Sequence, residues 1–488
     1  MLSTRACGRP GRSPAKPNAI LTIILISYFM ILLDNSVIFT GLPSIRSGLG
    51  LGPAALSWVQ DAYTLVFGGL LLLGARAGDL VGRRRLFIIG LAIFGIASLL
   101  IGLAPTGWWI VAARALQGIG AAVVAPTSLS LITANFTGEA RSRAVAWYSA
   151  TAGIGASLGL LVGGALAAWV SWRAAFLVNV PIAAMMIVAA RRVLPETERR
   201  RGRFDAVGAA CATLGVGALV FGIIESAERG WAAPTTLTAL VVGVLLLVVL
   251  VLHESRAEQP IMPLRLFGDR ERSGAYAVRM LYMGAMIGFF YFTTQYLQDA
   301  LGFSPLQAGL GFLPMTVVNF AVAMAIPRLA SRVPGAVLLL AGVAGTFAGM
   351  AWLSRLDPDG TYLGSVALPM LLIGAGQGLA FAPLTSSGIA RVPAEDAGAA
   401  SGLLNTAHQM GMALGLGILI ALSTHAGTGE STAQVTTRVS TALAGSSALL
   451  ALALLLVLIV IVPTRRAPTA PVTVASGRTD EHAEETLR

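Results

Sequence analysis

Long apolar stretches separated by short polar segments run along almost the whole chain. A hydrocarbon core of about 30 Å is crossed by roughly 20 apolar residues in a helix, because lipid cannot satisfy exposed backbone groups. This pattern predicts an all-α integral membrane protein with fourteen transmembrane helices. The predicted spans cover residues 20–40, 57–75, 86–104, 108–134, 145–170, 176–194, 206–226, 235–252, 275–297, 305–329, 336–354, 362–384, 397–421 and 441–462.

The polar segments divide these spans into groups of six, two and six. Two charged runs, at 195–203 and 253–272, flank the middle pair. We therefore expect two six-helix bundles, at 20–195 and 274–462, joined by a linker at 196–273 that holds two extra transmembrane helices. Residues 1–19 and 463–488 are expected to be cytoplasmic tails, the second one disordered because it is polar and lacks apolar periodicity.

Charge decides the orientation of the spans. The net charge of +11 would suggest a nucleic-acid partner in a soluble protein, but only 12% of the residues are charged, and Arg gathers after the even-numbered spans. By the positive-inside rule both termini are cytoplasmic, which requires an even number of spans. Heavy use of Ala, Gly, Val and Arg indicates a bacterial genome, and hence the bacterial cytoplasmic membrane. The opposite loops hold about one Arg each: Arg46, Arg173, Arg229, Arg355 and Arg438.

Several chemistries are unsupported by the sequence. Lys16 is the only lysine, so the chain has no phosphate-binding loop of the G-x-x-x-x-G-K-[ST] type. The four histidines are scattered without metal-ligand spacing, and no G-x-S-x-G motif occurs. We expect no enzyme activity, no metal, no cofactor and no nucleic-acid partner. Energy for transport would come from an ion gradient or a partner subunit.

A weak internal repeat suggests two related halves. Gly118 and Gly120 precede Ala-Pro in span 4, as Gly376 and Gly378 precede Ala-Pro in span 12. The prolines are 257 residues apart, and the glycine pairs of spans 5 and 13 are 256 apart. Such an offset is expected of a parallel-repeat transporter. Chance among 56 glycines is the alternative explanation.

The segment after span 2 carries an acid, a glycine and an arginine cluster: Asp79, Gly82, Arg83 and Arg84. It resembles the G-x-L-x-D-R-x-G-R-K/R signature of the major facilitator superfamily, with the first glycine displaced. The resemblance implies a charged latch between bundle helices. A plain positive-inside loop is the alternative.

Spans 4 and 5 strengthen the resemblance. Arg114-Ala-Leu-Gln117-Gly118-Ile-Gly120 is similar to the family's R-x-x-Q-G-x-G-A-A signature, which is associated with proton coupling, although an arginine there could also extend to the membrane face. Span 5 is similar to the antiporter signature G-x-x-x-G-P-x-x-G-G, with Leu160 in place of the proline. Its glycines would also permit ordinary close helix packing. They are Gly155, Gly159, Gly163 and Gly164.

Further segments resemble the fourteen-helix drug:proton antiporters, including Leu33-Asp34-Asn35-Ser36-Val37, the stretch from Ser171 to Pro181, and the stretch from Gln295 to Pro314. The resemblance implies a transporter that alternates access to a midplane cavity and exports a hydrophobic or amphipathic compound, such as an antibiotic, against protons. We expect it to be a monomer. A proton-coupled nutrient importer and a membrane sensor without transport are the competing hypotheses.

Candidate site residues follow from position and residue type. Asp34 and Asp61, with Arg114 nearby, are predicted to carry the proton, because a buried acid can bind and release one. Asp61 facing external water, and Asp34 making only a packing hydrogen bond, are the alternatives. The predicted substrate cavity is lined by polar and aromatic side chains that could also be packing residues: Tyr28, Tyr63, Gln117, Tyr291, Gln295 and His408.

Overall fold

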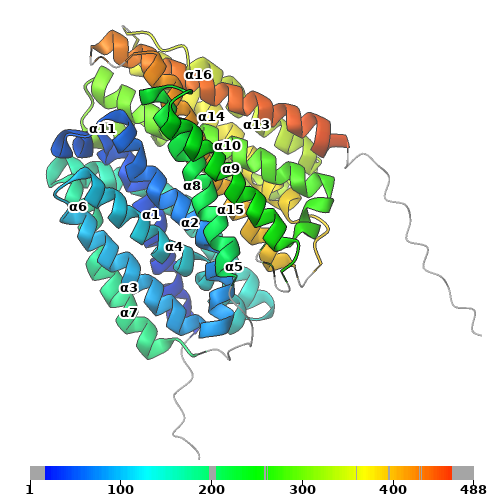
Figure 1. Ribbon diagram of the computed structural model, residues 1–488. Coiled ribbons are helices and arrows are strands. Elements are labelled where there is room, and N and C mark those ends of the chain that lie inside the picture. Colours follow the sequence, from blue (N-terminus) through cyan, green and yellow to red (C-terminus); the bar gives the residue numbers. More distant parts are fainter. Residues whose placement is uncertain are drawn as a thin grey trace, which may run out of the picture.

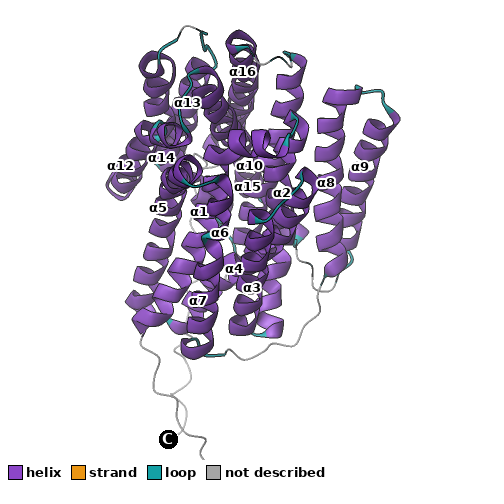
Figure 2. Cartoon of the chain, turned by 90° about the vertical axis from the view of Figure 1, so that its left-hand side faces the viewer, coloured by secondary structure: helices purple, strands orange, loops and turns teal. Residues whose placement is uncertain are grey.

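The computed structural model describes residues 17–196, 205–257, 260, 262–358, 360–393, 396–427, 429 and 431–463. Every regular element in these ranges is a helix (Figure 2). Seven α-helices come before the first long gap and make up what we call the first half of the molecule: α1 (Pro17–Leu49), α2 (Pro53–Val81), α3 (Arg83–Gly102), α4 (Gly107–Asn135), α5 (Gly138–Trp169), α6 (Trp172–Leu177) and α7 (Asn179–Val193).

Two further helices, α8 (Ala206–Arg229) and α9 (Pro234–Glu254), separate this half from the second half. Short π-helical segments, η2 to η4, continue or precede three α-helices there, and η1 is a 3-10 turn. The second half contains η1 (Leu264–Gly268), α10 (Arg270–Gln295), η2 (Tyr296–Ala300), α11 (Pro305–Leu310), α12 (Leu313–Ala330), α13 (Gly335–Leu353), η3 (Leu363–Ala367), α14 (Leu368–Gly388), α15 (Ala397–His425), α16 (Thr432–Leu456) and η4 (Val457–Ile461).

The number of helices agrees with the predicted membrane spans. Thirteen helical segments in the described part of the chain are long and apolar enough to cross a bilayer. The remaining span corresponds to α5, which is 32 residues long and whose Leu158–Trp169 portion is apolar. At 1.5 Å per residue, such a helix exceeds the thickness of the hydrocarbon core. The all-α membrane fold expected from the sequence is confirmed.

Neighbouring helices pack within each half, and α8 and α9 pack as a pair (Figure 1). In the first half α4 lies against α2 and α3, and α5 lies along α1. The second half repeats this arrangement, with α14 against α12 and α13, and α15 along α10. The pair α8–α9 lies at the edge of the molecule in Figure 2, and α8 contacts both α2 and α15. The extra helices therefore cover a seam between the halves.

Helix starts follow local sequence signals. Asp205, Asp269 and Ser304 each accept a hydrogen bond from a backbone N–H in the first turn of α8, α10 and α11. Such caps satisfy N–H groups that have no partner inside the helix. Pro53 and Pro305 begin their helices because proline lacks the N–H that the first turn cannot use.

The helices are longer than the predicted spans and break at places that hydropathy did not reveal. Span 2 was expected to end at residue 75, but α2 continues to Val81, so only Gly82 separates it from α3. Span 6 is interrupted at Val178 between α6 and α7, and span 10 is interrupted at 311–312. Hydropathy detects the lipid-facing length of a helix, whereas backbone hydrogen bonding continues past the membrane surface.

Equivalent glycine contacts support the internal repeat and correct its register. A Cβ at Gly120 would approach the backbone of Gly90 and Phe94 in α3, just as one at Gly376 would approach Gly342 and Thr346 in α13. The sequence comparison paired Gly118 and Gly120 with Gly376 and Gly378, which is wrong by two residues. Helix contacts pair Gly120 with Gly376, 256 positions apart, as for the glycines of α5 and α15.

Candidate functional site

A polar cluster formed by side chains of four helices lies inside the first half. The Arg114 guanidinium of α4 forms an ion pair with Asp34 of α1, with 2.7 Å between Nη1 and Oδ2. Gln117 donates to Asp34 Oδ1 at 2.8 Å and to Ser98 Oγ of α3 at 2.8 Å. Asn179 of α7 donates to the same Asp34 oxygen at 2.8 Å. All five side chains are 0% exposed, so the charge pair is shielded from solvent.

Aromatic rings and a backbone carbonyl complete the surroundings of Arg114. Its Nε donates to the carbonyl of Val59 in α2 at 3.0 Å. The guanidinium carbon lies 4.2 Å from the centre of the Tyr63 ring and 5.8 Å from that of Phe176. Cation–π contacts strengthen when the cation is desolvated. Arg114 therefore faces the interior of the first half and does not extend to the membrane face, which excludes the alternative considered for span 4.

Some polar atoms of the cluster and its surroundings have no hydrogen-bond partner. Arg114 Nη2, the Tyr63 hydroxyl and Asn179 Oδ1 are buried without a hydrogen-bond partner. Because a buried pair is held only by its mutual attraction and hydrogen bonds, loss of either charge would leave the other uncompensated. Asp34 is thus the acceptor that holds Arg114, Gln117 and Asn179 together.

Asp61 occupies a separate buried position. It is 0% exposed, and neither of its carboxylate oxygens has a hydrogen-bond partner. This overturns the alternative in which Asp61 faces external water. The sequence predicts Asp34 and Asp61 as joint proton carriers, but Asp61 shares no hydrogen bond with the Asp34 cluster.

The four glycines of span 5 divide into two kinds of contact. Added Cβ atoms at Gly155, Gly159 and Gly163 would meet residues of α1, the last at 2.7 Å from the Val37 Cα. At Gly164 the Cβ would lie 2.6 Å from the carbonyl oxygen of Pro305, which belongs to the second half. The motif therefore holds α5 tightly against α1 and also permits close approach of the two halves.

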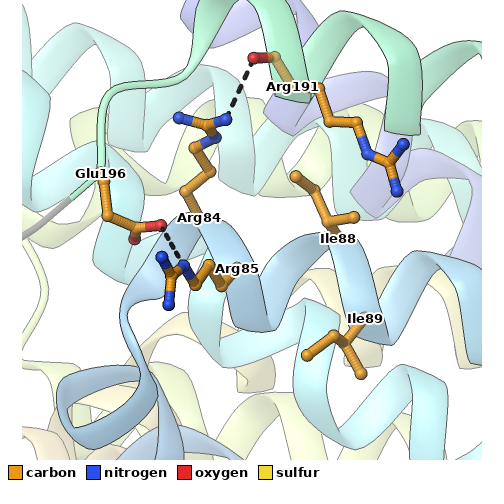
Figure 3. Close-up of a pocket in the computed structure, with 6 residues that line it drawn as sticks. All are labelled: Arg84, Arg85, Ile88, Ile89, Arg191 and Glu196. Carbon is orange, nitrogen blue, oxygen red and sulfur yellow. Dashed lines mark hydrogen bonds and ion pairs between the residues drawn. The ribbon is translucent and has the colours of Figure 1, made fainter.

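The arginine cluster after α2 binds the ends of neighbouring helices (Figure 3). Arg83 donates to the Ser130 carbonyl of α4 at 2.9 Å, and Arg84 donates to the Arg191 carbonyl of α7 at 3.2 Å. Gly82 adopts φ 104°, a conformation that favours glycine. The side chain of Asp79 lies outside the described part of the structure, so the predicted latch between Asp79 and Arg83 stays a prediction.

A surface hollow of about 480 Å³ lies beside this cluster. Figure 3 shows that α3 and the end of α7 form it, together with Glu196, whose carboxylate is 3.5 Å from Arg85. The hollow is lined by Arg84, Arg85, Ile88, Ile89, Arg191 and Glu196. It therefore lies within the first half and is distinct from the cavity predicted between the bundles.

The residues expected to line a single cavity occupy four different places. Tyr63 and Gln117 belong to the Arg114 cluster, whereas Tyr28 stacks on Tyr148 of α5 with ring centres 4.0 Å apart. Tyr291 and Gln295 are buried one helical turn apart in α10. His408 is partly buried in α15. Residue type alone identified polar and aromatic positions but could not group them.

The two halves are joined at the end of the molecule that holds Arg46, which we call the Arg46 end. Arg46 of α1 forms an ion pair with Asp299 at 3.2 Å. Gln298 donates to the Thr40 carbonyl at 3.0 Å. At Gly309 an added Cβ would lie 2.6 Å from the Leu160 carbonyl oxygen. These contacts close the halves against each other at this end.

Comparison with known proteins decides the family. Residues 24–416 match the family model described as Major Facilitator Superfamily. The chain belongs to the major facilitator superfamily. The resemblance stated from the sequence motifs is thereby confirmed, and the superfamily's helix signatures map onto α2–α5 of this structure.

Several curated superfamily relatives are named for antibiotic export or resistance. The chain is 39% identical to "Cephamycin export protein CmcT" of Amycolatopsis lactamdurans over 458 residues, covering 92% of this chain and 94% of the relative. It is 40% identical to "Puromycin resistance protein pur8" of Streptomyces alboniger, covering 83% and 82%. It is 31% identical to "Tetracenomycin C resistance and export protein" of Streptomyces glaucescens, covering 86% and 78%.

Solved structures support the superfamily fold. A peptide transporter POT in complex with sulfate matches with a TM-score of 0.67 at 14% identity, covering 93% of this chain and 96% of that one. A bacterial homologue of the human lysosomal transporter Spinster, in an inward-facing and unoccupied conformation, matches with a TM-score of 0.65 at 17% identity, covering 93% and 98%. At this identity the likeness shows the fold alone.

Sequence reasoning missed part of the cluster. Asn179 appeared only inside a family motif, without a role, and its hydrogen bond to Asp34 crosses 145 positions of the chain. Ser98 gave no signal, because a single serine in an apolar helix usually bonds its own backbone, as it also does here to Phe94. Within the described ranges no group of three or more His, Cys, Asp or Glu residues is placed to hold a metal ion.

Proposed function

We propose that this protein is a proton-driven exporter that removes a hydrophobic or amphipathic antibiotic-like compound from the cytoplasm. The observation that carries the proposal is the near full-length similarity to a protein named for cephamycin export. Puromycin and tetracenomycin resistance proteins are similar over more than four fifths of this chain. Their different named compounds favour the drug efflux class without selecting one substrate.

The Asp34–Arg114 pair is the proposed coupling element. Protonation of Asp34 would remove its negative charge and leave Arg114 as an uncompensated buried cation. The guanidinium and its hydrogen-bonded neighbours would then rearrange, which alters contacts among α1, α3, α4 and α7. Deprotonation would restore the pair. Asp61 is the proposed second proton site, since a buried carboxyl without a partner is most stable when neutral.

Alternating access is proposed to use the two halves as moving units. The Arg46 end would face away from the cytoplasm and both termini would face it, in agreement with the arginine distribution. Closure at the Arg46 end, through the Arg46–Asp299 pair and the Gly164 contact, would then leave the substrate exchanging with the cytoplasm. We propose that α8 and α9 line the seam as accessory helices and that the protein acts as a monomer without cofactors.

Transport in inverted membrane vesicles tests this function. A panel of labelled antibiotics is added to vesicles whose interior is acidified, and an uncoupler is added in a parallel sample. We expect uptake of at least one compound that stops with the uncoupler. Asp34→Asn should retain binding and exchange of that compound but lose accumulation driven by the pH gradient. Asn keeps the size of the side chain and one acceptor oxygen but carries no charge, so it stands in for the protonated state of Asp34.

Each competing function gives a different result. A nutrient importer would carry substrate out of the inverted vesicles when the gradient is applied, and a sensor would move nothing. Proton-driven accumulation by Asp34→Asn at the wild-type rate would contradict the coupling role of Asp34. Asp61→Asn is measured beside it, because unimpaired transport by both variants would place the proton pathway elsewhere.

A further inference from the structure

Arg279 of α10 is buried in the second half of the described chain. It is 3% exposed, and its Nε and Nη1 atoms are buried without a hydrogen-bond partner. Its guanidinium carbon lies 3.8 Å from the centre of the Phe381 ring in α14. Within the described ranges, no carboxylate lies within ion-pair distance of Arg279. The proposed coupling site, which lies in the first half, does not use this residue.

Other buried arginines of the described chain are bonded. Arg114 has Asp34 and a backbone carbonyl. Arg272 donates to the carbonyls of Leu266 and Ala390 at 2.6 and 3.1 Å. Arg438 donates to the carbonyl of Gly429 at 3.5 Å. Arg279 therefore differs from them in lacking an oxygen acceptor for these two nitrogens.

An unpaired guanidinium is unfavourable inside a transmembrane bundle. Removing such a cation from water is costly, and a cation–π contact recovers only part of that cost. Intramembrane cations of this kind face partners or substrate pathways. The imbalance indicates that the partner of Arg279 is a molecule other than the chain itself.

The surroundings favour an anion that carries an aromatic or other apolar body. Phe381 remains 40% exposed while its ring covers the guanidinium, so part of the ring is free to contact another apolar surface. Gly411 packs against the backbone of Met280, which holds α10 close to α15 beside this position. Arg279 is thus fixed among three helices of one half.

We propose that Arg279 binds the carboxylate of the exported compound and that Phe381 contacts its aromatic body, so that the transported class is amphipathic organic anions. A guanidinium presents a planar fork of donors that can bind both oxygens of a carboxylate. The proposal rests on the export function proposed above. It places substrate recognition in the second half, apart from the Asp34 cluster.

Binding to purified protein tests the proposal independently of transport. A panel of aromatic carboxylates, each paired with its uncharged methyl ester, is titrated against the full-length protein in nanodiscs of zwitterionic lipid. We expect at least one acid to bind more tightly than its ester. Arg279→Gln should weaken binding of that acid by about ten- to hundred-fold, the range of a charged hydrogen bond, and leave the ester unaffected. Arg279→Lys should restore part of the affinity.

Several outcomes would overturn it. These are equal binding of every acid and its ester, unchanged affinity in Arg279→Gln, or an anionic lipid that copurifies through Arg279 and is not displaced by the acids. The last result would assign the site to a lipid phosphate. If instead acid binding depends on Arg279 but no compound is driven by a proton gradient, the export function fails and the anion site stands.

Thermal unfolding distinguishes ligand binding from a structural role. Because Arg279 has no protein acceptor at two nitrogens, Arg279→Gln should unfold at the wild-type temperature or above it when no ligand is present. Addition of the tightest-binding acid should raise the unfolding temperature of the wild type only. Arg272→Gln is the matched control, since loss of its two carbonyl contacts should lower the unfolding temperature. A similar loss in ligand-free Arg279→Gln would contradict the proposal.

Discussion

The two halves of the molecule share their helix contacts but differ in the chemistry at equivalent positions. Gly159 meets Leu33 of α1 as Gly415 meets Gly284 of α10. This contact aligns α1 with α10, and the contacts of Gly120 and Gly376 align α3 and α4 with α13 and α14. In this alignment the equivalents of Asp34, Ser98, Arg114 and Gln117 are, in the same order, Ala285, Met350, Met370 and Ile373. These four counterparts are all 0% exposed. One scaffold thus holds a buried charge pair in one half and an apolar core in the other.

The reverse holds six residues before Asp34, at Tyr28, nearly two helical turns along α1. Tyr28 of α1 is stacked on Tyr148, whereas the equivalent position in α10 is Arg279. The comparison teaches that helix packing does not require buried charge, since the second half achieves it with Met and Ile. The buried charges of each half therefore call for a functional explanation, and the two halves place theirs differently.

The largest expected effect comes from replacing the buried charges of the first half by the apolar residue types at the equivalent positions of the second half. Arg114→Met alone leaves Asp34 without its cation and should destabilise the protein by about 3–5 kcal/mol. Asp34→Ala combined with Arg114→Met removes both charges and should restore most of that stability, yet proton-driven transport should be absent. Thermal unfolding in detergent and vesicle uptake measure the two quantities.

A control and a contrary result are available for this exchange. Met370→Leu in the second half conserves volume and should cost less than about 1.5 kcal/mol, with transport retained. Uncoupler-sensitive transport by the double variant would show that the Asp34–Arg114 pair is structural, and the difference between the halves would lose its functional meaning.

An intermediate effect should separate contacts within a half from contacts between halves. Gly159→Ala places a Cβ 2.6 Å from the Ser36 Cβ inside the first half and should cost about 1–3 kcal/mol of stability. Gly164→Ala instead meets the Pro305 carbonyl across the halves, so it should favour conformations that are open at the Arg46 end. Maleimide labelling of Gln298→Cys, with Cys7 and Cys211 replaced by serine, reports that opening.

Labelling should be several-fold faster with Gly164→Ala than with Gly159→Ala. Gly217→Ala in α8 is the control, because an added Cβ there has no atom within 4 Å. Equal labelling rates in all three variants would mean that the Gly164 contact does not limit opening.

The smallest expected effect concerns the stability of the protein at acidic pH. Hydrogen bonds from Arg391 hold the pKa of Asp269 below its ordinary value, and those from Arg265 do the same for Asp396. Their stabilisation is complete above the unfolded pKa of about 3.9 and is lost as the pH falls through the lowered folded pKa. Arg83 and Arg84 of the first half donate to backbone carbonyls, which do not titrate in this range.

Unfolding followed from pH 6 to pH 2.5 checks this difference. Both arginines are more than half exposed, so each pair should contribute at most about 1 kcal/mol after solvent screening. Arg391→Gln should unfold at a lower temperature than the wild type at pH 6 and lose less stability on acidification. If Arg391→Gln loses as much stability on acidification as the wild type, Asp269 is excluded as a contributor to the acid dependence of stability.

The number and approximate position of the membrane helices could be predicted from the sequence, because the cost of exposing backbone and charge to lipid acts locally along the chain. The sequence also identified the family, through short motifs around Asp79, Arg114 and Gly159. Asp34 and Arg114 could be selected as site residues because charged side chains are rare within apolar spans.

Tertiary structure alone decided which of these residues act together. Asp34, Ser98, Arg114 and Asn179 come from four helices, and their hydrogen bonds cross as many as 145 positions of the chain. Asp61 and Tyr28 looked equally suited by residue type but lie elsewhere, and Arg279 was not selected from the sequence. Helix crossing and rotation set these distances, and both depend on side-chain packing between helices that no local pattern encodes.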